Sequence, residues 1–364
     1  MIKVLVVEDS LVAREYLVHI LNSDPGIEVI GTAHNGIEAV EAVDRLRPNV
    51  VTMDINMPVM DGLDATRRIM ETNPVPIVIV SGVWDPKEVE TTFKAMEAGA
   101  LAIIQRPVGI GHPDAGDMAK EMLLKVKLMS EVKVVRRWGR YGQKKYPQKA
   151  DTPGPAHEVV PSRASREVAL VAIGASTGGP LVIRTILDAL PKDFPASILI
   201  VQHIAAGFLK GMVHWLAETS GVTVKIAEHG ERLLPGHAYL APDGFNLGVD
   251  CGGRLYLDSG ETKDSLRPSV AYLFRSVAES FGGKAIGLLL TGMGGDGAEE
   301  LKLMKERGAV TIAQDKDSSV IYGMPGLAVE LGAATYVLSP ERITAALKVL
   351  AKGGTYMQED RFAR

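Results

Sequence analysis

The sequence predicts an α/β protein made of two doubly wound parallel-sheet domains joined by a linker. Three observations lead to this prediction: a length of 364 residues, short apolar runs that alternate with amphipathic stretches, and a basic, proline-rich segment between the two halves. Strand patterns that alternate with helix patterns are typical of parallel sheets covered by helices on both faces. The length accommodates two domains, and 46% hydrophobic residues can fill two ordinary cores.

The first domain is predicted over residues 1–125, where five strand-length apolar runs occur. These runs are KVLVVE, EVIGTA, VVTMDI, PIVIVSG and ALAIIQRP. Helical patterns separate them, for example SLVAREYLVHILNS and GLDATRRIME. Each strand pattern is therefore followed by a helix pattern, which is the βα repetition of a parallel sheet.

Residues 126–166 have a different composition and are predicted to form a linker. EVKVVRRWGRYGQKKYPQKA carries seven Lys or Arg against one acid, and DTPGPAHEVVPSRASR is rich in proline and polar residues. A solvated connector is one interpretation, and docking of the basic run on an acidic surface is the other. The second domain is predicted over 167–352, from the runs VALVAIGA, SILIVQHI, HAYLAP, RLYLD, KAIGLLLTG and AVTIAQ. Residues 353–364 are expected to be a frayed tail.

Composition and the first residues exclude several classes of protein. A formal charge of −4 gives no strong attraction to nucleic acid or to a membrane surface. The single cysteine, Cys251, excludes an internal disulfide and fits a reducing compartment. MIKVLVVEDS lacks the features of a signal peptide, and no apolar run reaches the roughly 18–20 residues of a membrane helix. We expect a cytoplasmic monomer that neither binds nucleic acid nor inserts into a membrane.

Acidic side chains follow two strand runs of the first domain. Glu8 and Asp9 end the first run, and Asp54 ends the third. In an open parallel sheet the carboxyl ends of the strands line the ligand crevice, so these three carboxylates should meet. Like charges repel unless a cation joins them, and clustered hard oxygen ligands suit Mg²⁺.

A hydroxyl and a cation follow two further runs of the same domain. Ser81 comes after VIVIV and Arg106 after LAIIQ. A carboxylate nucleophile beside Mg²⁺, with a hydroxyl and a cation for phosphoryl oxygens, indicates a phosphoryl acceptor. The alternative is structural, because Asp9 or Ser10 could simply cap the helix that follows the first strand.

The motifs VVEDS, TMDINMPVMDG, VSG and a basic residue before proline resemble the receiver domain of bacterial response regulators. The resemblance covers residues 1–125 and implies a flavodoxin-like fold. It also implies Asp54 as the phosphorylated residue, and Mg²⁺ held by Glu8, Asp9 and Asp54. The phosphodonor that it implies is a chemotaxis histidine kinase.

The chain departs from the receiver pattern at two positions. Arg106 stands where the family normally has lysine, and a planar, forked guanidinium is not equivalent to a compact ammonium. Ile103 stands where an aromatic switch residue is usual. The resemblance therefore supports phosphorylation chemistry without the usual aromatic relay.

The stretch GASTGGP in the second domain satisfies G-x-S-x-G, a pattern that presents Ser176 on a sharp strand-to-helix turn. A phosphate-binding loop would need a lysine, and this stretch has none. A serine nucleophile needs a base, and of the eight histidines only His203 directly follows an apolar run, ILIVQH. Asp296 follows KAIGLLL in a glycine-rich bend and could orient the imidazole. Three separate strand ends thus predict a Ser-His-Asp site.

The same bend supports an alternative interpretation. Gly292, Gly294 and Gly297 spell the dinucleotide fingerprint G-x-G-x-x-G after a strand. Asp315 and Asp317 lie near the spacing expected of a ribose-binding acid. A nicotinamide enzyme would explain these residues, but it would leave the serine and histidine without a role.

Six stretches of the second domain occur in the order of a known family. GASTGGP, VQHI, PGHAYLAPDG, LRPSVAYLFRSVA, LLLTGMGGDGAEEL and QDKDSSVIYGMP resemble the catalytic domain of chemotaxis protein-glutamate methylesterases (CheB), over about residues 168–350. The resemblance implies a Rossmann-like α/β esterase domain that demethylates glutamates of chemoreceptors. It also implies deamidation of glutamine and ester hydrolysis without a cofactor. Asn246 stands where this family often has histidine.

The resemblance implies a mechanism for the predicted residues. Ser176 attacks the ester carbonyl, His203 transfers the proton, and Asp296 holds the ring. The tetrahedral oxyanion needs hydrogen-bond donors, and we expect backbone amides near Thr177 and Met293 to supply them.

Regulation is also implied, because the unphosphorylated receiver of this family covers the catalytic face and phosphorylation at Asp54 relieves the block. Two other classes of protein are alternatives to this one. A phosphorylation-dependent adaptor with an inactive esterase-like domain would not need an intact Ser-His-Asp set. A DNA-binding response regulator predicts a helix-turn-helix after the linker, and the sequence shows none.

Overall fold

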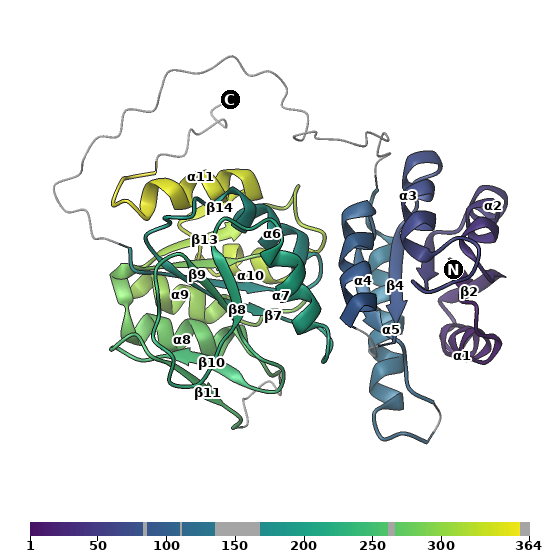
Figure 1. Cartoon of the computed structure of the whole chain (residues 1–364), viewed down its shortest axis with the longest axis horizontal. Coiled ribbons are helices and arrows are strands. Elements are labelled where there is room, and N and C mark those ends of the chain that lie inside the picture. Colours follow the sequence, from purple (N-terminus) through teal and green to yellow (C-terminus); the bar gives the residue numbers. More distant parts are fainter. Residues whose placement is uncertain (83–85, 110, 135–167, 261–265, 357–364) are drawn as a thin grey trace, which may run out of the picture. The chain divides into compact units, whose positions relative to one another are not determined.

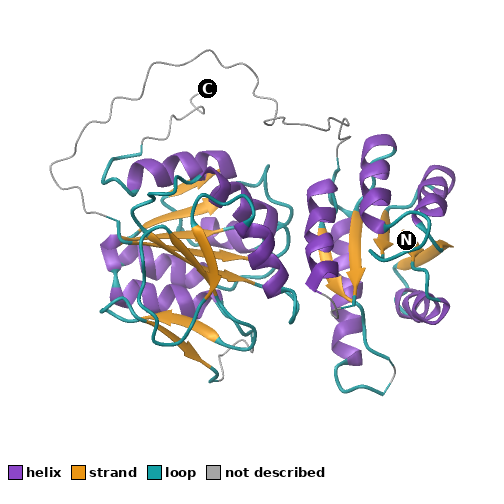
Figure 2. Ribbon diagram, in the orientation of Figure 1, coloured by secondary structure: helices purple, strands orange, loops and turns teal. Residues whose placement is uncertain are grey.

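The computed structural model describes residues 1–82, 86–109, 111–134, 168–260 and 266–356. The chain divides into two compact units, Met1–Ala156 and His157–Arg364 (Figure 1). Each unit contains a parallel sheet flanked by helices on both faces, which confirms the predicted fold class (Figure 2). Residues 135–166 of the predicted linker and residues 357–364 of the predicted tail lie outside the described residues.

The first unit has a five-stranded sheet with the order β2-β1-β3-β4-β5, and all neighbouring strands are parallel. Helix α1 contacts α5, whereas α2, α3 and α4 contact one another in sequence, so the helices cover both faces. The elements are β1 (Ile2–Val7), α1 (Leu11–Asn22), β2 (Ile27–Ala33), α2 (Gly36–Leu46), β3 (Val50–Met53), α3 (Gly62–Thr72), β4 (Ile77–Ser81), α4 (Pro86–Ala98), β5 (Ala102–Gln105) and α5 (Ala115–Ser130).

Polar caps begin the first three helices directly after the carboxyl edge of this sheet. The side chains of Ser10, Asn35 and Asp61 accept the backbone amides of the first turns of α1, α2 and α3. Helix α5 continues to Ser130, past residue 125, where the sequence suggested that the domain ends. Its last turns bury Val126 and Met129, so packing extends the helix.

The second unit has a seven-stranded parallel sheet with the order β14-β13-β12-β6-β7-β9-β8. Helix α6 contacts α7 and α11, and helix α9 contacts α8 and α10. The elements are β6 (Leu170–Ala175), α6 (Gly179–Ala189), β7 (Ser197–Gln202), α7 (Leu209–Ala217), β8 (Thr223–Ile226), β9 (His237–Leu240), β10 (Asn246–Val249), β11 (Leu255–Asp258), α8 (Val270–Ser280), the 3-10 helix η1 (Gly282–Lys284), β12 (Ala285–Leu289), α9 (Ala298–Glu306), β13 (Val310–Gln314), α10 (Met324–Glu330), β14 (Tyr336–Leu338) and α11 (Pro340–Leu350).

One predicted strand lies outside the main sheet. The run RLYLD forms β11, which pairs antiparallel with β10 in a separate two-stranded sheet. Strand β10 contacts helix α8. Gly248 of β10 lies against the ring of Tyr256, and a Cβ there would be 2.3 Å from the ring, so the glycine lets the two strands pair closely. Local periodicity identifies such a strand but not the sheet that it joins.

Both sheets have a point where the chain reverses the direction in which it adds strands. In the first sheet this point lies between β1 and β3, and in the second it lies between β6 and β12. Open α/β sheets bind their ligands in the crevice at the carboxyl ends of the strands beside such a point. The segments that follow β1, β3, β6 and β12 are therefore the positions in which functional residues are expected.

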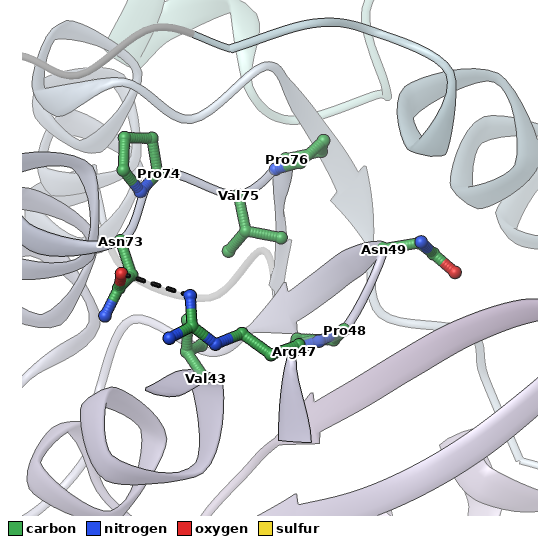
Figure 3. Close-up of a pocket in the computed structure, with 8 residues that line it drawn as sticks. All are labelled: Val43, Arg47, Pro48, Asn49, Asn73, Pro74, Val75 and Pro76. Carbon is green, nitrogen blue, oxygen red and sulfur yellow. Dashed lines mark hydrogen bonds between the residues drawn. The ribbon is translucent and has the colours of Figure 1, made fainter. Parts of the chain in front are cut away.

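The first unit also has a cavity of about 400 Å³ at the other end of its sheet (Figure 3). Pro48 and Asn49 line it just before β3 begins, whereas Asp54 follows the end of that strand. Arg47 reaches across the cavity and donates from Nη1 to Asn73 Oδ1 at 3.4 Å. Among the described residues, no helix is both long enough and apolar enough to span a membrane.

Candidate active and phosphorylation sites

The three predicted carboxylates of the first unit converge. Oxygens of Glu8, Asp9 and Asp54 all lie within 4.8 Å of one another. Glu8 and Asp54 are buried and Asp9 is exposed. Nη2 of Arg106 lies 2.9 Å from Glu8 Oε2 and 2.9 Å from Asp54 Oδ1. The sequence prediction that Arg106 lies beside this acidic group therefore agrees with the geometry.

The charges in this pocket do not balance with Arg106 alone. Burial and the nearby charge of Asp54 raise the pKa of Glu8 from 4.5 to about 7, although Arg106 opposes the shift. Arg106 pairs with the carboxylates of Glu8 and Asp54, and Arg14 donates to the backbone carbonyls of Glu8 and Asp9. The three carboxylates still outnumber these cations, and a hard divalent cation would remove the remaining repulsion. Glu8, Asp9 and Asp54 thus fit Mg²⁺ by donor type, number and proximity.

Backbone packing holds the segment around Asp54 in place. The amide of Gly62 donates to the Ile55 carbonyl at 2.9 Å. A Cβ on Gly62 would lie 2.0 Å from the Asp54 carbonyl oxygen, so a side chain cannot be placed there without moving the loop. Ser81 is buried at the end of β4, and its carbonyl accepts the Arg106 amide at 2.9 Å. The predicted hydroxyl and cation therefore come from neighbouring strand ends.

The pH dependence of Mg²⁺ binding should follow Glu8. Because the pKa of Glu8 is about 7, a proton must leave before the carboxylate can bind a cation, and affinity should rise by up to about tenfold per pH unit up to pH 7. Calorimetric titration of Mg²⁺ between pH 6 and pH 8 measures this rise. Glu8→Gln should bind more weakly with a flatter pH profile. Equal wild-type affinity at pH 6 and pH 8 would contradict the assignment.

The raised pKa of Glu8 also makes the free energy of unfolding depend on pH. The pKa of Glu8 is higher in the folded chain than in the unfolded chain, so the folded state binds the proton more tightly. The metal-free free energy of unfolding should therefore fall as the pH rises from about 4.5 to about 7. The difference between wild type and Glu8→Gln isolates this effect from the titration of the histidines.

In the second unit, Ser176 and His203 lie next to each other across two parallel strands. Ser176 directly follows β6, and His203 directly follows β7. The His203 amide donates to the Ala175 carbonyl at 2.9 Å, which continues the ladder past the end of both strands. The sheet register therefore places these two residues side by side at the carboxyl edge.

The turn that carries Ser176 is held by close backbone packing. Gly178 has φ of 81°, a conformation that a residue with a side chain rarely adopts, and it begins α6. A Cβ on Gly292 would lie 2.6 Å from Ser176 Cβ. Gln202 donates from Nε2 to the carbonyls of Ser176 and His203, both at 2.8 Å. One buried amide thus links the serine turn to the histidine.

Asp296 follows β12 and lies against the N-terminus of α8. Its Oδ2 is 2.9 Å from His203 Nε2 and accepts the Val270 amide at 2.7 Å. Its Oδ1 accepts the Ala271 amide at 2.9 Å and the Ser269 hydroxyl at 3.1 Å. Burial acts to raise the pKa of Asp296, but His203 and the helix amides outweigh it, and the pKa lies below its usual value. The carboxylate is therefore ionised and fully hydrogen-bonded.

The glycines of the dinucleotide fingerprint have other roles in this fold. Gly292 packs on Ser176, and Gly297, with φ of 86°, begins α9. Asp315 accepts the Ser318 amide at 3.0 Å and the Ser318 hydroxyl at 2.6 Å within its own turn. These contacts account for the glycines of G-x-G-x-x-G and for Asp315 without a bound dinucleotide.

Comparison with known proteins identifies the family. The family model described as CheB methylesterase matches residues 171–347, and the response regulator receiver domain matches residues 4–112. A protein-glutamate methylesterase/protein-glutamine glutaminase of Geobacter metallireducens is 56% identical over 353 residues, which are 96% of this chain and 99% of the relative. The chain belongs to the CheB methylesterase family. A relative of the same name from Nitrosospira multiformis is 55% identical over 348 residues, 95% of this chain and 96% of the relative.

Two solved structures from Thermotoga maritima resemble the two halves of this CheB family member. The CheB methylesterase catalytic domain is 41% identical, with 50% of this chain and 97% of that chain covered and a TM-score of 0.48. The response regulator domain of CheB is 36% identical, with 36% of this chain and 98% of that chain covered and a TM-score of 0.33.

The sequence did not predict the residues of this CheB family member whose hydrogen bonds hold Ser176, His203 and Asp296 in place. Gln202 has a signal in the sequence, since it is a polar residue at the end of an otherwise apolar strand run. Ser269 caps α8 and also contacts Asp296, and only the first of these roles is visible in a local pattern. Asn246 is fully buried, and its Oδ1 accepts the Ser269 amide at 3.0 Å.

Proposed function

We propose that the protein hydrolyses methyl esters of glutamate residues in chemoreceptors by a Ser-His-Asp mechanism, and that phosphorylation of Asp54 controls this activity. The observation that carries the proposal is the bond between His203 Nε2 and Asp296 Oδ2, at 2.9 Å, beside the turn of Ser176. The names of the relatives support the substrate class.

The contact of His203 with Asp296 supports a separate role for each ring nitrogen. Nε2 faces an ionised carboxylate and therefore carries a proton, which leaves Nδ1 as the base. Nδ1 accepts the Ser176 proton as Oγ attacks the ester carbonyl, and then passes it to the departing methoxide to give methanol. Water repeats the sequence on the acyl-enzyme, releasing glutamate and restoring Ser176. Asp296 stabilises the imidazolium that forms in both steps.

Backbone amides near Thr177 and Met293 are proposed to bind the oxyanion of the tetrahedral intermediate. Both residues belong to the turns at the ends of β6 and β12, so the two donors would flank Ser176. The same chemistry applied to a glutamine side chain releases ammonia in place of methanol. In both steps His203 is proposed to carry the proton, which comes from Ser176 in acylation and from water in deacylation.

The acidic pocket is proposed to switch this activity. Glu8, Asp9 and Asp54 would hold Mg²⁺, which would neutralise charge as Asp54 accepts a phosphoryl group from a histidine kinase. Ser81 and Arg106 would contact the phosphoryl oxygens, and the ion pair of Arg106 with Asp54, at 2.9 Å, supports this role for Arg106. The added charge needs to favour the active arrangement by only about 1.4 kcal/mol for a tenfold effect.

One assay tests catalysis and control together. Methanol release from membranes that contain methylated chemoreceptors should occur with the full-length protein and rise about tenfold after treatment with a small acyl phosphate and Mg²⁺. Asp54→Asn should retain the basal rate and lose the rise. No methanol release from any form would instead favour a phosphorylation-dependent adaptor. An equal rise in Asp54→Asn would exclude Asp54 as the control site.

A further inference from the structure

We propose that Thr291 is a positioning residue that fixes the Ser176 turn against the glycine-rich bend. The proposal rests on the proposed function, because it assigns Thr291 a purpose only if Ser176 is the nucleophile. Thr291 is the first residue of the bend TGMGGDG, which follows β12, and it is fully buried. Within the part of the chain that the structure describes, the Thr291 hydroxyl bonds to backbone atoms of Thr177 and Ile321, so its effect on the reaction would act through the backbone.

Thr291 binds the backbone on both sides of the Ser176 side chain. The Ser176 amide donates to the Thr291 carbonyl at 3.0 Å. The Thr291 hydroxyl donates to the Thr177 carbonyl at 3.0 Å. The peptide unit that ends at the Ser176 amide and the one that begins at the Thr177 carbonyl are thus attached to one residue, which limits rotation of the turn that presents Oγ.

The hydroxyl of Thr291 also joins a third segment. It accepts the Ile321 amide at 3.0 Å, and the Ile321 carbonyl is a second acceptor at 3.2 Å. The Gly292 amide donates to the same carbonyl at 3.0 Å. Three segments that are far apart in the sequence therefore meet at one hydroxyl group, directly behind Ser176.

A buried side chain anchors Thr291 itself. The Thr291 amide donates to Gln314 Oε1 at 2.8 Å, and Gln314 is fully buried at the end of β13. Gln314 Nε2 in turn donates to the Ser318 carbonyl at 2.9 Å. Thr291 is therefore hydrogen-bonded to the end of a strand of the main sheet, which gives it the support that a positioning role requires.

The hydrogen bonds of Thr291 would fix the distance between the two proposed oxyanion donors. Thr177 belongs to one turn and Met293 to the other, and Thr291 is the residue that hydrogen-bonds the first turn while it leads into the second. Gly292 packs directly on Ser176, so the two turns touch and cannot shift independently while the bond is intact. Without the hydroxyl, the Thr177–Gly178 peptide unit loses this bond and can rotate, and rotation about the Thr177 Cα shifts the adjoining peptide unit, which carries the Thr177 amide, relative to the oxyanion.

Three variants of the full-length protein test this role. Thr291→Val keeps the shape but removes the hydroxyl, and kcat for methanol release should fall about 10–100-fold with KM nearly unchanged. Thr291→Ser keeps the hydroxyl and should stay within about threefold of the wild-type rate, since the hydrogen bonds remain. Thr311→Val is the matched control, because buried Thr311 also donates from its hydroxyl, to the Ala333 carbonyl at 2.6 Å, near the amino end of β13.

The control separates positioning from stability. Both valine variants lose buried hydroxyl bonds and should unfold at a lower temperature, whereas only Thr291→Val should lose kcat. Wild-type kcat in Thr291→Val, or an equal loss of kcat in Thr311→Val, overturns the proposal. Full activity in Ser176→Ala would remove the proposed function, and the assignment of Thr291 with it. An inactive Ser176→Ala beside a fully active Thr291→Val would remove only the assignment of Thr291.

Discussion

Replacing Ser176 by alanine will lower methanol release from methylated receptor by about 10⁴-fold or more, because the nucleophile is lost from a group of residues that acts as a unit. The fold should tolerate the change. The bonds that hold the turn use backbone atoms of Ser176, whose amide donates to the Thr291 carbonyl and whose carbonyl accepts the Gly179 amide and Gln202 Nε2. Alanine retains all of these bonds.

The measurement is methanol release with and without a phosphodonor, beside thermal unfolding of the same samples. Ser220→Ala is a suitable control, since Ser220 is also a turn serine whose hydroxyl caps a backbone amide, that of Val222, at 3.2 Å. The control should keep the wild-type rate. Residual activity in Ser176→Ala that still responds to phosphorylation at the wild-type level would show that another group attacks the ester.

The positions of the principal residues could be predicted from the sequence because strand ends are local features. An apolar run followed by Ser176, His203 or Asp296 places each side chain at the carboxyl edge of a parallel sheet. The same argument placed Glu8 and Asp54 together. None of these predictions needed the strand order, because all parallel strands end at the same edge.

The sequence could not predict the contacts between elements that are distant in the chain and become neighbours only in the fold. The amides of Val270 and Ala271 reach Asp296 only because α8 packs beside the end of β12, and no local pattern encodes that pairing. Thr291 resembles an ordinary residue after a strand in the sequence, because its hydrogen-bond partners Thr177, Gln314 and Ile321 are distant along the chain. The pairing of β10 with β11 outside the main sheet has the same cause.

The environment of Asp296 also predicts the effect of its replacement by asparagine. Four donors surround the carboxylate, two on each oxygen. An asparagine side chain has one oxygen and one NH₂ group, so its NH₂ group must face either His203 and Val270 or Ala271 and Ser269. In either orientation two donors point at a donor, and a buried amide or hydroxyl loses its partner.

Asp296→Asn should therefore lower kcat by about 10³–10⁴-fold, by two routes. An NH₂ group facing His203 favours the tautomer with the proton on Nδ1, which cannot accept the Ser176 proton. The opposite orientation keeps the tautomer but provides no negative charge for the imidazolium. Asp250→Asn is the matched control, because Asp250 also accepts backbone amides, those of Gly252 and Arg254, in an exposed turn. That variant should retain the wild-type kcat.

The loss of stability in Asp296→Asn should also depend on pH, which gives a second, independent test. The pKa of Asp296 is lower in the folded chain than in the unfolded chain, so the carboxylate stabilises the fold above the unfolded pKa and this contribution is lost as the pH falls through the folded pKa. The free energy of unfolding should thus differ between wild type and Asp296→Asn by about 1–3 kcal/mol at pH 7 and by less below about pH 4. Denaturant unfolding at both pH values measures the difference. A gap that stayed constant with pH would mean that lost packing, and not the ionised carboxylate among its four donors, accounts for the destabilisation.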